Sequence, residues 1–208
     1  MKKLAIAIFG VLLLTAYSCE KDSDVTSTTP TPPVNTVKLT DQEISDLKFL
    51  REEEKLARDV YLYAFDKYGT QIFKNISNSE QSHMDQILVL LDSFEIVDPA
   101  SPDTGVFNEP ALQDLYVALT TTVDSSLVHA LTVGATVEDL DISDIIHFTV
   151  NTDIPEIISM YSILECGSRN HIRGYTNQLN QQGATYVPQF LTQAEYDAII
   201  SGAHETCN

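Results

Sequence analysis

Residues 51–61 read REEEKLARDVY, and this stretch decides the fold class of the chain. Leu50, Ala57 and Tyr61 repeat at the three- and four-residue spacing of one face of an α-helix. Glu54 falls on the same face, four residues after Leu50 and three before Ala57. A buried carboxylate is costly unless it is paired or bound to a metal. The stretch therefore predicts a helix whose inward face carries an acid in need of a partner.

The same helical spacing continues on both sides of this stretch. Thr40 and Glu43 form the pattern of a capping box, so the first helix is expected from there to about Lys67, with Gly69 after it. The other expected helices run from near Ser77 or Ser79 to before Pro99, from Pro110 through Leu119, from Ser125 to near Val150, from about Pro155 to Gln182, and from Thr192 to Ile200. No alternating apolar run demands a sheet. The predicted fold class is all-α, with four long helices, extra short helices and a longer crossover connection between the second and third long ones.

The N-terminus has the organisation of a secretory signal peptide. Lys2 and Lys3 precede an apolar run, residues 4–14, which is shorter than the roughly 20 residues that cross a bilayer. Residues 1–18 resemble a lipoprotein signal, in which cleavage leaves Cys19 as a lipid-modified N-terminus. The acidic residues that follow resemble the tether of Bacteroidetes lipoproteins. The alternative is an ordinary signal peptide followed by a coincidental cysteine.

The rest of the chain divides into a tether and one domain. Residues 19–37 are rich in Ser, Thr and Pro and are expected to be disordered, whereas residues 38–208 suit a single helical domain. The lipoprotein resemblance implies a cell-envelope location, periplasmic or surface-exposed, with the lipid anchor as the only membrane contact. A formal net charge of −18 excludes a nucleic-acid partner, which requires clustered Lys and Arg.

Three further helices carry acids or imidazoles on their apolar stripes. Glu80 and His83 lie on the second long helix, Glu138 and Asp141 on the third, and His171 on the fourth. Residues three apart on a helix lie about 5–6 Å from each other and can reach one metal centre. Oxygen and imidazole donors without thiolates suit iron, manganese or zinc. The predicted metal ligands are Glu54, Glu80, His83, Glu138, Asp141 and His171.

These segments together resemble the ferritin-like di-iron carboxylate superfamily, in particular its rubrerythrin-like members. More closely, they are similar to an uncharacterised ferritin-like family of bacteria and archaea that is known as a domain of unknown function. The segments that carry this similarity are REEEKLARDVY (51–61), SEQSHM (79–84), VEDLDISD (137–144) and GSRNHIRGY (167–175). The resemblance implies a ferritin-like four-helix bundle that holds two metal ions, iron or alternatively manganese.

The chain departs from the superfamily pattern on the fourth helix. Ser168 stands three residues before His171, where the pattern has Glu, and Asp141 is expected to supply the missing carboxylate. Glu53 is a rival to Glu54 for the inward position, although an acidic run such as residues 52–54 is by itself typical of a solvated face. His129, His147 and His204 are expected to be ordinary hydrogen-bonded side chains.

Three functions stay open at this point. The first is an oxidoreductase that reduces peroxide or uses O2, and the second is binding or oxidation of Fe(II). The third is a metal-free helical binding module. No rubredoxin-like four-cysteine segment is present, so an electron donor would be a separate molecule; a homodimer is also possible. Tyr61, Tyr161 and Tyr175 are either core aromatics or redox relays, and Cys166 and Cys207 are either a disulfide or two free thiols.

Overall fold

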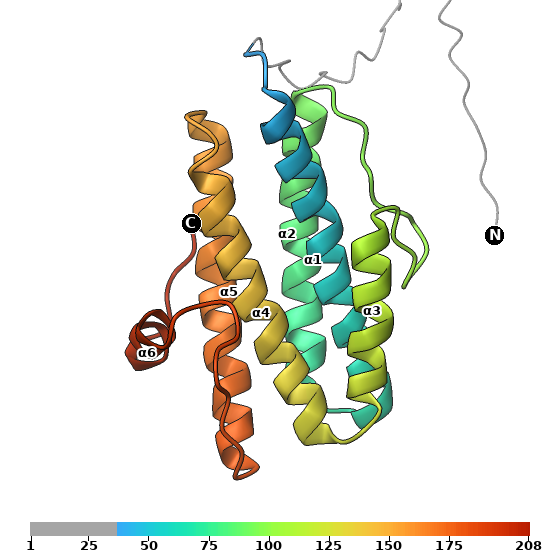
Figure 1. Cartoon of the computed structure of the whole chain (residues 1–208), viewed down its shortest axis with the longest axis vertical. Helices are drawn as coiled ribbons and strands as arrows, with labels where there is room; N and C mark the ends of the chain where they lie inside the picture. The colour runs from blue at the N-terminus through green and yellow to red at the C-terminus, as the bar shows by residue number, and fades with distance from the viewer. Residues whose placement is uncertain (1–36) are drawn as a thin grey trace, which may run out of the picture. The chain divides into compact units, whose positions relative to one another are not determined.

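The computed structural model describes residues 37–208; the predicted signal peptide, Cys19 and nearly all of the predicted tether lie outside the described residues. The described part contains six α-helices and no strand, which confirms the all-α prediction for it (Figure 1). The helices are α1 (Asp41–Tyr68), α2 (Gln71–Ser93), α3 (Pro110–Val123), α4 (Leu127–Thr149), α5 (Pro155–Gln181) and α6 (Gln193–Ser201).

Both ends of α1, but not the start of α2, lie where the sequence predicts them. At the start of α1, the Glu43 amide donates to the Thr40 hydroxyl and the Thr40 amide donates to the Glu43 carboxylate. Gly69 ends α1 in the left-handed conformation, with a φ of 63°. The predicted start of α2 near Ser77 or Ser79 is wrong, because the helix begins at Gln71. Its N-cap is Thr70, a residue type that commonly caps helices, although the Thr70 side chain makes no capping bond here.

The four long helices pack as two closely joined pairs. α1 lies along α2, and α4 lies along α5, each pair joined by a short connection (Figure 1). α1 also contacts α4, and α2 contacts α5 less extensively. The connection between α2 and α4 contains α3, which packs against α1 and α4, and α6 packs against α5.

The apolar core is divided into two clusters along the helices. Leu56 on α1 and Ile76 on α2 belong to one cluster, while Leu50 and Ile87 on the same two helices belong to the other. The polar side chains between these positions, Glu80 among them, are nevertheless buried. The fold therefore places a buried polar layer between two apolar clusters.

The loop before α3 is held by the acidic run of α1. Glu52 is buried and accepts the backbone amides of Asn108 and Glu109 at 2.7 and 2.9 Å. Glu53 and Glu54 are buried as well, so residues 52–54 do not form a solvated face.

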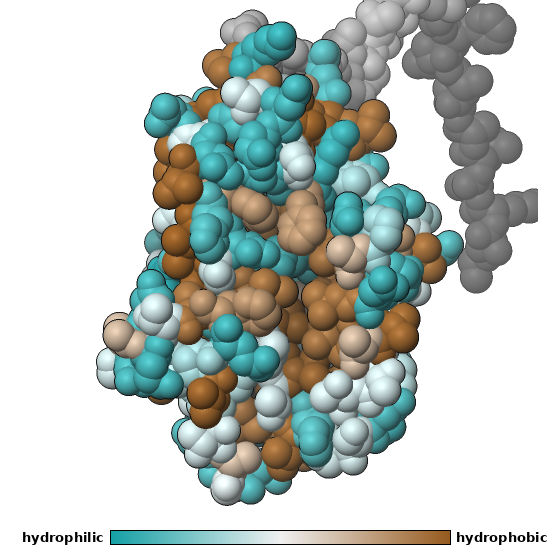
Figure 2. All heavy atoms as spheres, in the orientation of Figure 1, coloured by the Kyte–Doolittle hydropathy of each residue, from teal (hydrophilic) through white to brown (hydrophobic). Residues whose placement is uncertain are grey.

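The surface in Figure 2 is mixed in character. Hydrophobic side chains gather where α3 lies alongside α4, whereas hydrophilic ones predominate over the region where α1 begins (Figure 2). Among residues 37–208, no helix has the length and apolar content needed to cross a membrane.

Candidate metal centre

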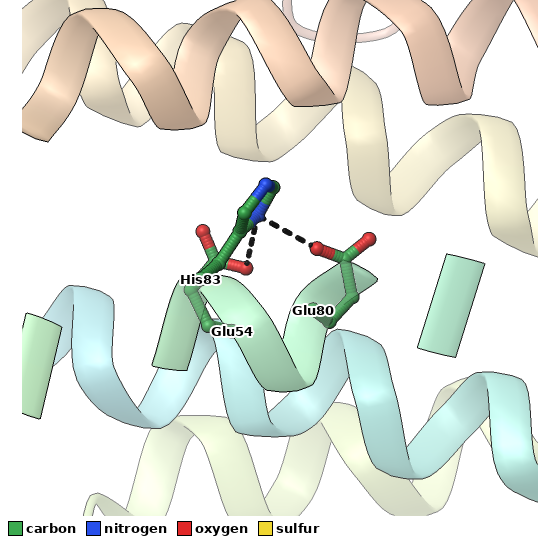
Figure 3. Close-up of side chains that lie close together, drawn as sticks. All are labelled: Glu54, Glu80 and His83. Atoms are coloured by element: carbon green, nitrogen blue, oxygen red, sulfur yellow. Dashed lines mark hydrogen bonds and ion pairs between the residues drawn. The ribbon is translucent and has the colours of Figure 1, made fainter. Parts of the chain in front are cut away.

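Two groups of buried donors meet between the long helices, and they share one residue. In the first group, Glu54 of α1 approaches Glu80 and His83 of α2 (Figure 3). In the second, Glu80 approaches Glu138 of α4 and His171 of α5. Within each group, the donor atoms lie within 4.8 Å of one another. Five of the six predicted metal ligands thus come together around Glu80.

The two histidines make equivalent contacts. His83 Nδ1 lies 2.9 Å from one oxygen of Glu80 and 3.2 Å from Glu54. His171 Nδ1 lies 2.9 Å from the other oxygen of Glu80 and 3.2 Å from Glu138. The two rings are stacked, with centroids 5.5 Å apart. The site therefore has two similar halves, each with one imidazole, one carboxylate of its own and one oxygen of the shared Glu80.

A glycine of α5 makes room for one of these rings. A Cβ atom at Gly167 would lie 2.6 Å from Nε2 of His83, closer than real Cβ contacts. Any other residue at this position would displace the His83 imidazole. The glycine that opens the segment GSRNHIRGY is thus a geometric requirement of the site.

Asp141, the sixth predicted ligand, lies beside the two groups rather than in either of them. The hydroxyl of Ser168 donates to its Oδ2 atom, while its buried Oδ1 atom has no hydrogen-bond partner. Burial raises the pKa of Asp141 well above its usual value, and the charges of Glu54 and Glu138 raise it further. Asp141 therefore stands next to the serine that replaces the expected fourth-helix Glu, with one oxygen unused.

A further buried acid, Glu53, extends this layer toward α4. Both of its carboxylate oxygens lack a hydrogen-bond partner. Burial, followed by the charges of Asp141 and Asp144, raises its pKa well above the usual value. Glu53 and Glu54 thus both point inward, so neither excludes the other. Sequence reasoning missed Asp144, whose signal was its position three residues after Asp141.

The electrostatics of the site follow from its excess of acids. Burial opposes protonation of His171, but Glu80 and Glu138 outweigh that effect and raise its pKa to about 10. Burial raises the pKa of Glu54 and of Glu138 to about 7. Glu80 behaves oppositely, because the two imidazoles overcome the effect of burial and lower its pKa. Without a metal, the site must therefore retain protons to limit repulsion among its carboxylates.

The cationic side chains nearest in sequence are engaged elsewhere. Lys55 and Arg58 both pair with Asp59, at 2.6 and 2.8 Å. Arg169 and Arg173 both pair with Glu205, each at 2.6 Å. The negative charge of the buried acids is therefore balanced by the two imidazoles and not by Lys or Arg. Unpartnered buried oxygens and a donor set of carboxylates and imidazoles could hold a metal ion.

Comparison with known proteins places this architecture in a family. Residues 43–203 match the model of the family described as "Uncharacterized protein domain (DUF2202)". The chain belongs to the DUF2202 family. It is similar to the uncharacterized protein MJ0754 of Methanocaldococcus jannaschii, with 46% identity over 168 residues that cover 80% of this chain and 91% of the relative.

A solved structure agrees with this assignment. The crystal structure of the hypothetical protein MJ0754 from Methanococcus jannaschii matches the present DUF2202 chain with a TM-score of 0.81 and 44% sequence identity. The match covers 83% of this chain and 99% of that one. The helical arrangement is therefore shared between the two proteins.

Other polar side chains of this DUF2202 domain orient the central residues. Ser79 Oγ lies 2.9 Å from Nε2 of His171, on the opposite side of the ring from the carboxylates. The hydroxyl of Tyr61 donates to Glu138 at 2.5 Å. Such outer contacts fix the orientation of potential ligands. Tyr175 packs 5.3 Å from Tyr61, ring centre to ring centre, whereas Tyr161 belongs to the apolar cluster around Leu50.

The remaining predicted residues lie away from the centre of the DUF2202 site. Cys166 and Cys207 are joined by a disulfide. His129 and His147 are exposed, and their Nδ1 atoms contact Ser126 Oγ and the Ser143 carbonyl. His204 is also exposed, but it lines a pocket that reaches His83 and His171.

Proposed function

We propose that the chain is a ferritin-like metalloprotein of the cell envelope that holds two metal ions, iron or manganese. It would use them for redox chemistry with peroxide or O2, or for oxidation of Fe(II). The observation that supports this proposal best is the pair of Glu/His groups around Glu80, which are buried while the nearby Lys and Arg side chains pair with other acids. Metal ions would supply the positive charge that these acids lack.

Each half of the site would hold one ion. Glu54 and His83 would serve the first ion, Glu138 and His171 the second, and Glu80 would offer one oxygen to each. The free oxygen of Asp141 would supply the additional carboxylate that Ser168 cannot. A bound pair of iron ions would supply the electrons that reduce peroxide or O2.

The protein residues control protons and orientation around the ions. Carboxylates must lose their protons to bind a metal, so the protons retained by Glu54 and Glu138 would leave as the site fills. Tyr61 donates a hydrogen bond to Glu138, which keeps one of its oxygens engaged. Ser79 holds the far nitrogen of His171 and directs Nδ1 toward the carboxylates.

The location and the redox partners rest on sequence alone. Cleavage and lipidation at Cys19 would anchor the protein to a membrane of the envelope, with the electron donor a separate molecule. Labelling of cells with a fatty-acid analogue tests the anchor: a Cys19→Ala variant is expected to lose all incorporated lipid.

A metal-free helical binding module is the alternative. Ser168 favours it, because this residue occupies the position of a ligand in the superfamily pattern and instead binds Asp141. In that case the acids of the site would remain protonated or paired with the two histidines.

Metal content decides between the two proposals. Elemental analysis of the purified protein after reconstitution with Fe(II) or Mn(II) is expected to give about two ions per chain. Glu80→Ala and His171→Ala are expected to lose them, whereas the exposed controls Glu156→Ala and His147→Ala keep them. A helical protein that binds no metal would establish the alternative. If metal is bound, peroxide reduction with a generic reductant, as opposed to Fe(II) oxidation alone, separates the two redox activities.

A further inference from the structure

One pocket of the molecule reaches both histidines of the candidate metal centre. It has a volume of about 470 Å³ and lies between α2 and α5, next to the C-terminal segment. Ser82 and His83 contribute from α2, and Gly167 and His171 contribute from α5. α2 and α5 contact each other far less than the closely packed pairs α1–α2 and α4–α5 do.

The outer wall of the pocket is a C-terminal strap, residues 203–208. The disulfide between Cys207 and Cys166 ties the strap to α5. Glu205 pairs with Arg169 and Arg173, and its backbone exchanges two hydrogen bonds with the side chain of Asn170, at 2.9 and 3.0 Å.

These restraints hold a segment that adds nothing to the apolar core. The sequence of the strap is AHETCN, and its residues are exposed or half-buried. Stabilisation of the core therefore does not explain why the strap is fixed so firmly. Its position over the two imidazoles gives a reason, because four of its residues line the pocket.

The lining defines what kind of molecule the pocket accepts. It offers the hydroxyls of Ser82 and Thr206, the amide of Gln86, and an apolar contact from Ile163. Its carboxylate, Glu205, is already neutralised by two arginines. No Lys or Arg lines the pocket, and its two buried imidazoles already face the carboxylates of the site. Because the chain also carries a net charge of −18, an anion would find no buried counter-charge that is not already paired.

The pocket has room for a molecule larger than O2 or peroxide. Pockets of roughly 300–1,000 Å³ typically hold small organic ligands, whereas a water-sized molecule needs only about 30 Å³. We propose that this pocket binds a small, neutral, hydroxylated organic molecule against His83 and His171, with the strap as its outer wall. Its role as a substrate or reductant site rests on the proposed function, but binding itself does not require the metal.

Phenol, compared with benzoate, tests the predicted ligand class. Ligand-observed NMR on the metal-free protein is expected to show saturable binding of phenol and none of benzoate. Ser82→Phe would fill the pocket from an exposed position and is expected to weaken phenol binding at least tenfold. The matched control Asn78→Phe, exposed on the same helix but outside the pocket, is expected to leave it unchanged.

A second variant tests the strap. Cys166→Ser combined with Cys207→Ser releases the covalent tie and is expected to weaken phenol binding at least threefold; unchanged binding would show that the strap is not a wall of the site. Absence of saturable phenol binding, equal binding to the Ser82→Phe variant, or equal binding of benzoate would overturn the proposal. If phenol binds to a protein that takes up no metal, the ligand pocket is supported and the metalloprotein proposal is contradicted. If two ions bind but phenol does not, the metalloprotein proposal is supported and the ligand pocket is contradicted.

Discussion

At the scale of single residues, the position of His83 depends on the absence of a side chain at Gly167. A Gly167→Ala substitution would bring a methyl group within 2.6 Å of the imidazole, so the ring must move. Helix propensity alone would favour alanine by roughly 0.5–1 kcal/mol, so a stable fold is still expected. We expect at least a tenfold loss of affinity for the ion held by His83, measured by calorimetric titration.

Gly174 provides a matched control on the same helix. A methyl group there would meet only the flexible end of Ile72, at 3.3 Å. Gly174→Ala is therefore expected to bind metal as the unmodified protein does. Equal affinities for the two variants would mean that His83 does not hold a metal.

The relation between Asp141 and Ser168 can be tested by exchange. Asp141→Ala is expected to reduce the metal content below two ions per chain, because the additional carboxylate is lost. The double variant Asp141→Ser, Ser168→Glu restores a carboxylate from α5 and is expected to recover two ions by elemental analysis. Full occupancy in Asp141→Ala would show that this aspartate is only a neighbour of the site.

Sequence pattern identified the residues around Glu80 but not the whole acidic layer. Helical spacing placed Glu54 inward, and its contact with His83 agrees with that placement. The pattern did not reveal that Glu53 is buried too. α1 contacts α2 on one side and α4 on another, so it buries a broader face than a single stripe describes. Which of several adjacent acids face inward depends on these tertiary contacts.

At the scale of elements, one carboxylate of α4 holds the chain segment that follows α5. Asp139 is fully buried and accepts the hydroxyl of Tyr186 and the backbone amides of residues 189–191. Asp139→Asn would replace one acceptor oxygen with an amide NH2 group, which is itself a donor and cannot accept these hydrogen bonds. We expect a loss of about 2–3 kcal/mol in the free energy of unfolding, measured with urea.

The control for this change is Asp197→Asn, which alters an exposed aspartate of α6. Its effect is expected to stay below about 0.5 kcal/mol. Metal binding should be unaffected in both variants, since Asp139 faces residues 186–191 rather than the site. A similar loss in both variants would contradict the anchoring role of Asp139.

Element boundaries were predictable where local chemistry marks them. The capping box at Thr40 and the left-handed Gly69 gave both ends of α1. The start of α2 was missed although Thr70 is a common N-cap residue, because the first turn is held by burial of Phe73 and not by a capping bond. Burial of that kind depends on partners far away in the sequence, including Tyr175, whose ring centre lies 5.8 Å from that of Phe73.

At the scale of the whole molecule, the acids of the site predict how the stability of the metal-free protein depends on pH. The pKa of Glu54 and Glu138 rises from the ordinary 4.5 to about 7 on folding, and that of His171 rises from 6.5 to about 10. A group with a raised pKa stabilises the fold below its unfolded pKa and loses this effect as pH rises through the folded one. The melting temperature of the metal-free protein is therefore expected to fall between about pH 4.5 and 10, measured by calorimetry.

Glutamine substitution supplies the control for this pH dependence. Glu138→Gln removes one titrating group and should flatten the decrease between about pH 4.5 and 7. The exposed Glu156→Ala should leave the slope as it is. A melting temperature that rises over this range in the metal-free protein would contradict the expected protonation of the site.

Metal binding should oppose this loss of stability. An ion that binds only the folded state stabilises it by about 4 kcal/mol when its free concentration is 1,000 times the dissociation constant. Loaded protein at pH 8 is therefore expected to melt at a higher temperature than metal-free protein, and a chelator should reverse the difference. Identical melting curves would indicate that the ions are not held by the folded site.

Glu80 contacts both histidines, so the loss of Glu80 during evolution should affect the site more than the loss of Glu54 or Glu138. A descendant that lost Glu54 or Glu138 would keep one complete half, and with it a centre on which selection could still act. A descendant that lost Glu80 would damage both halves in one step. Across the lineages that inherit this domain, Glu54 and Glu138 should vary independently, whereas loss of Glu80 should be accompanied by decay of both histidines.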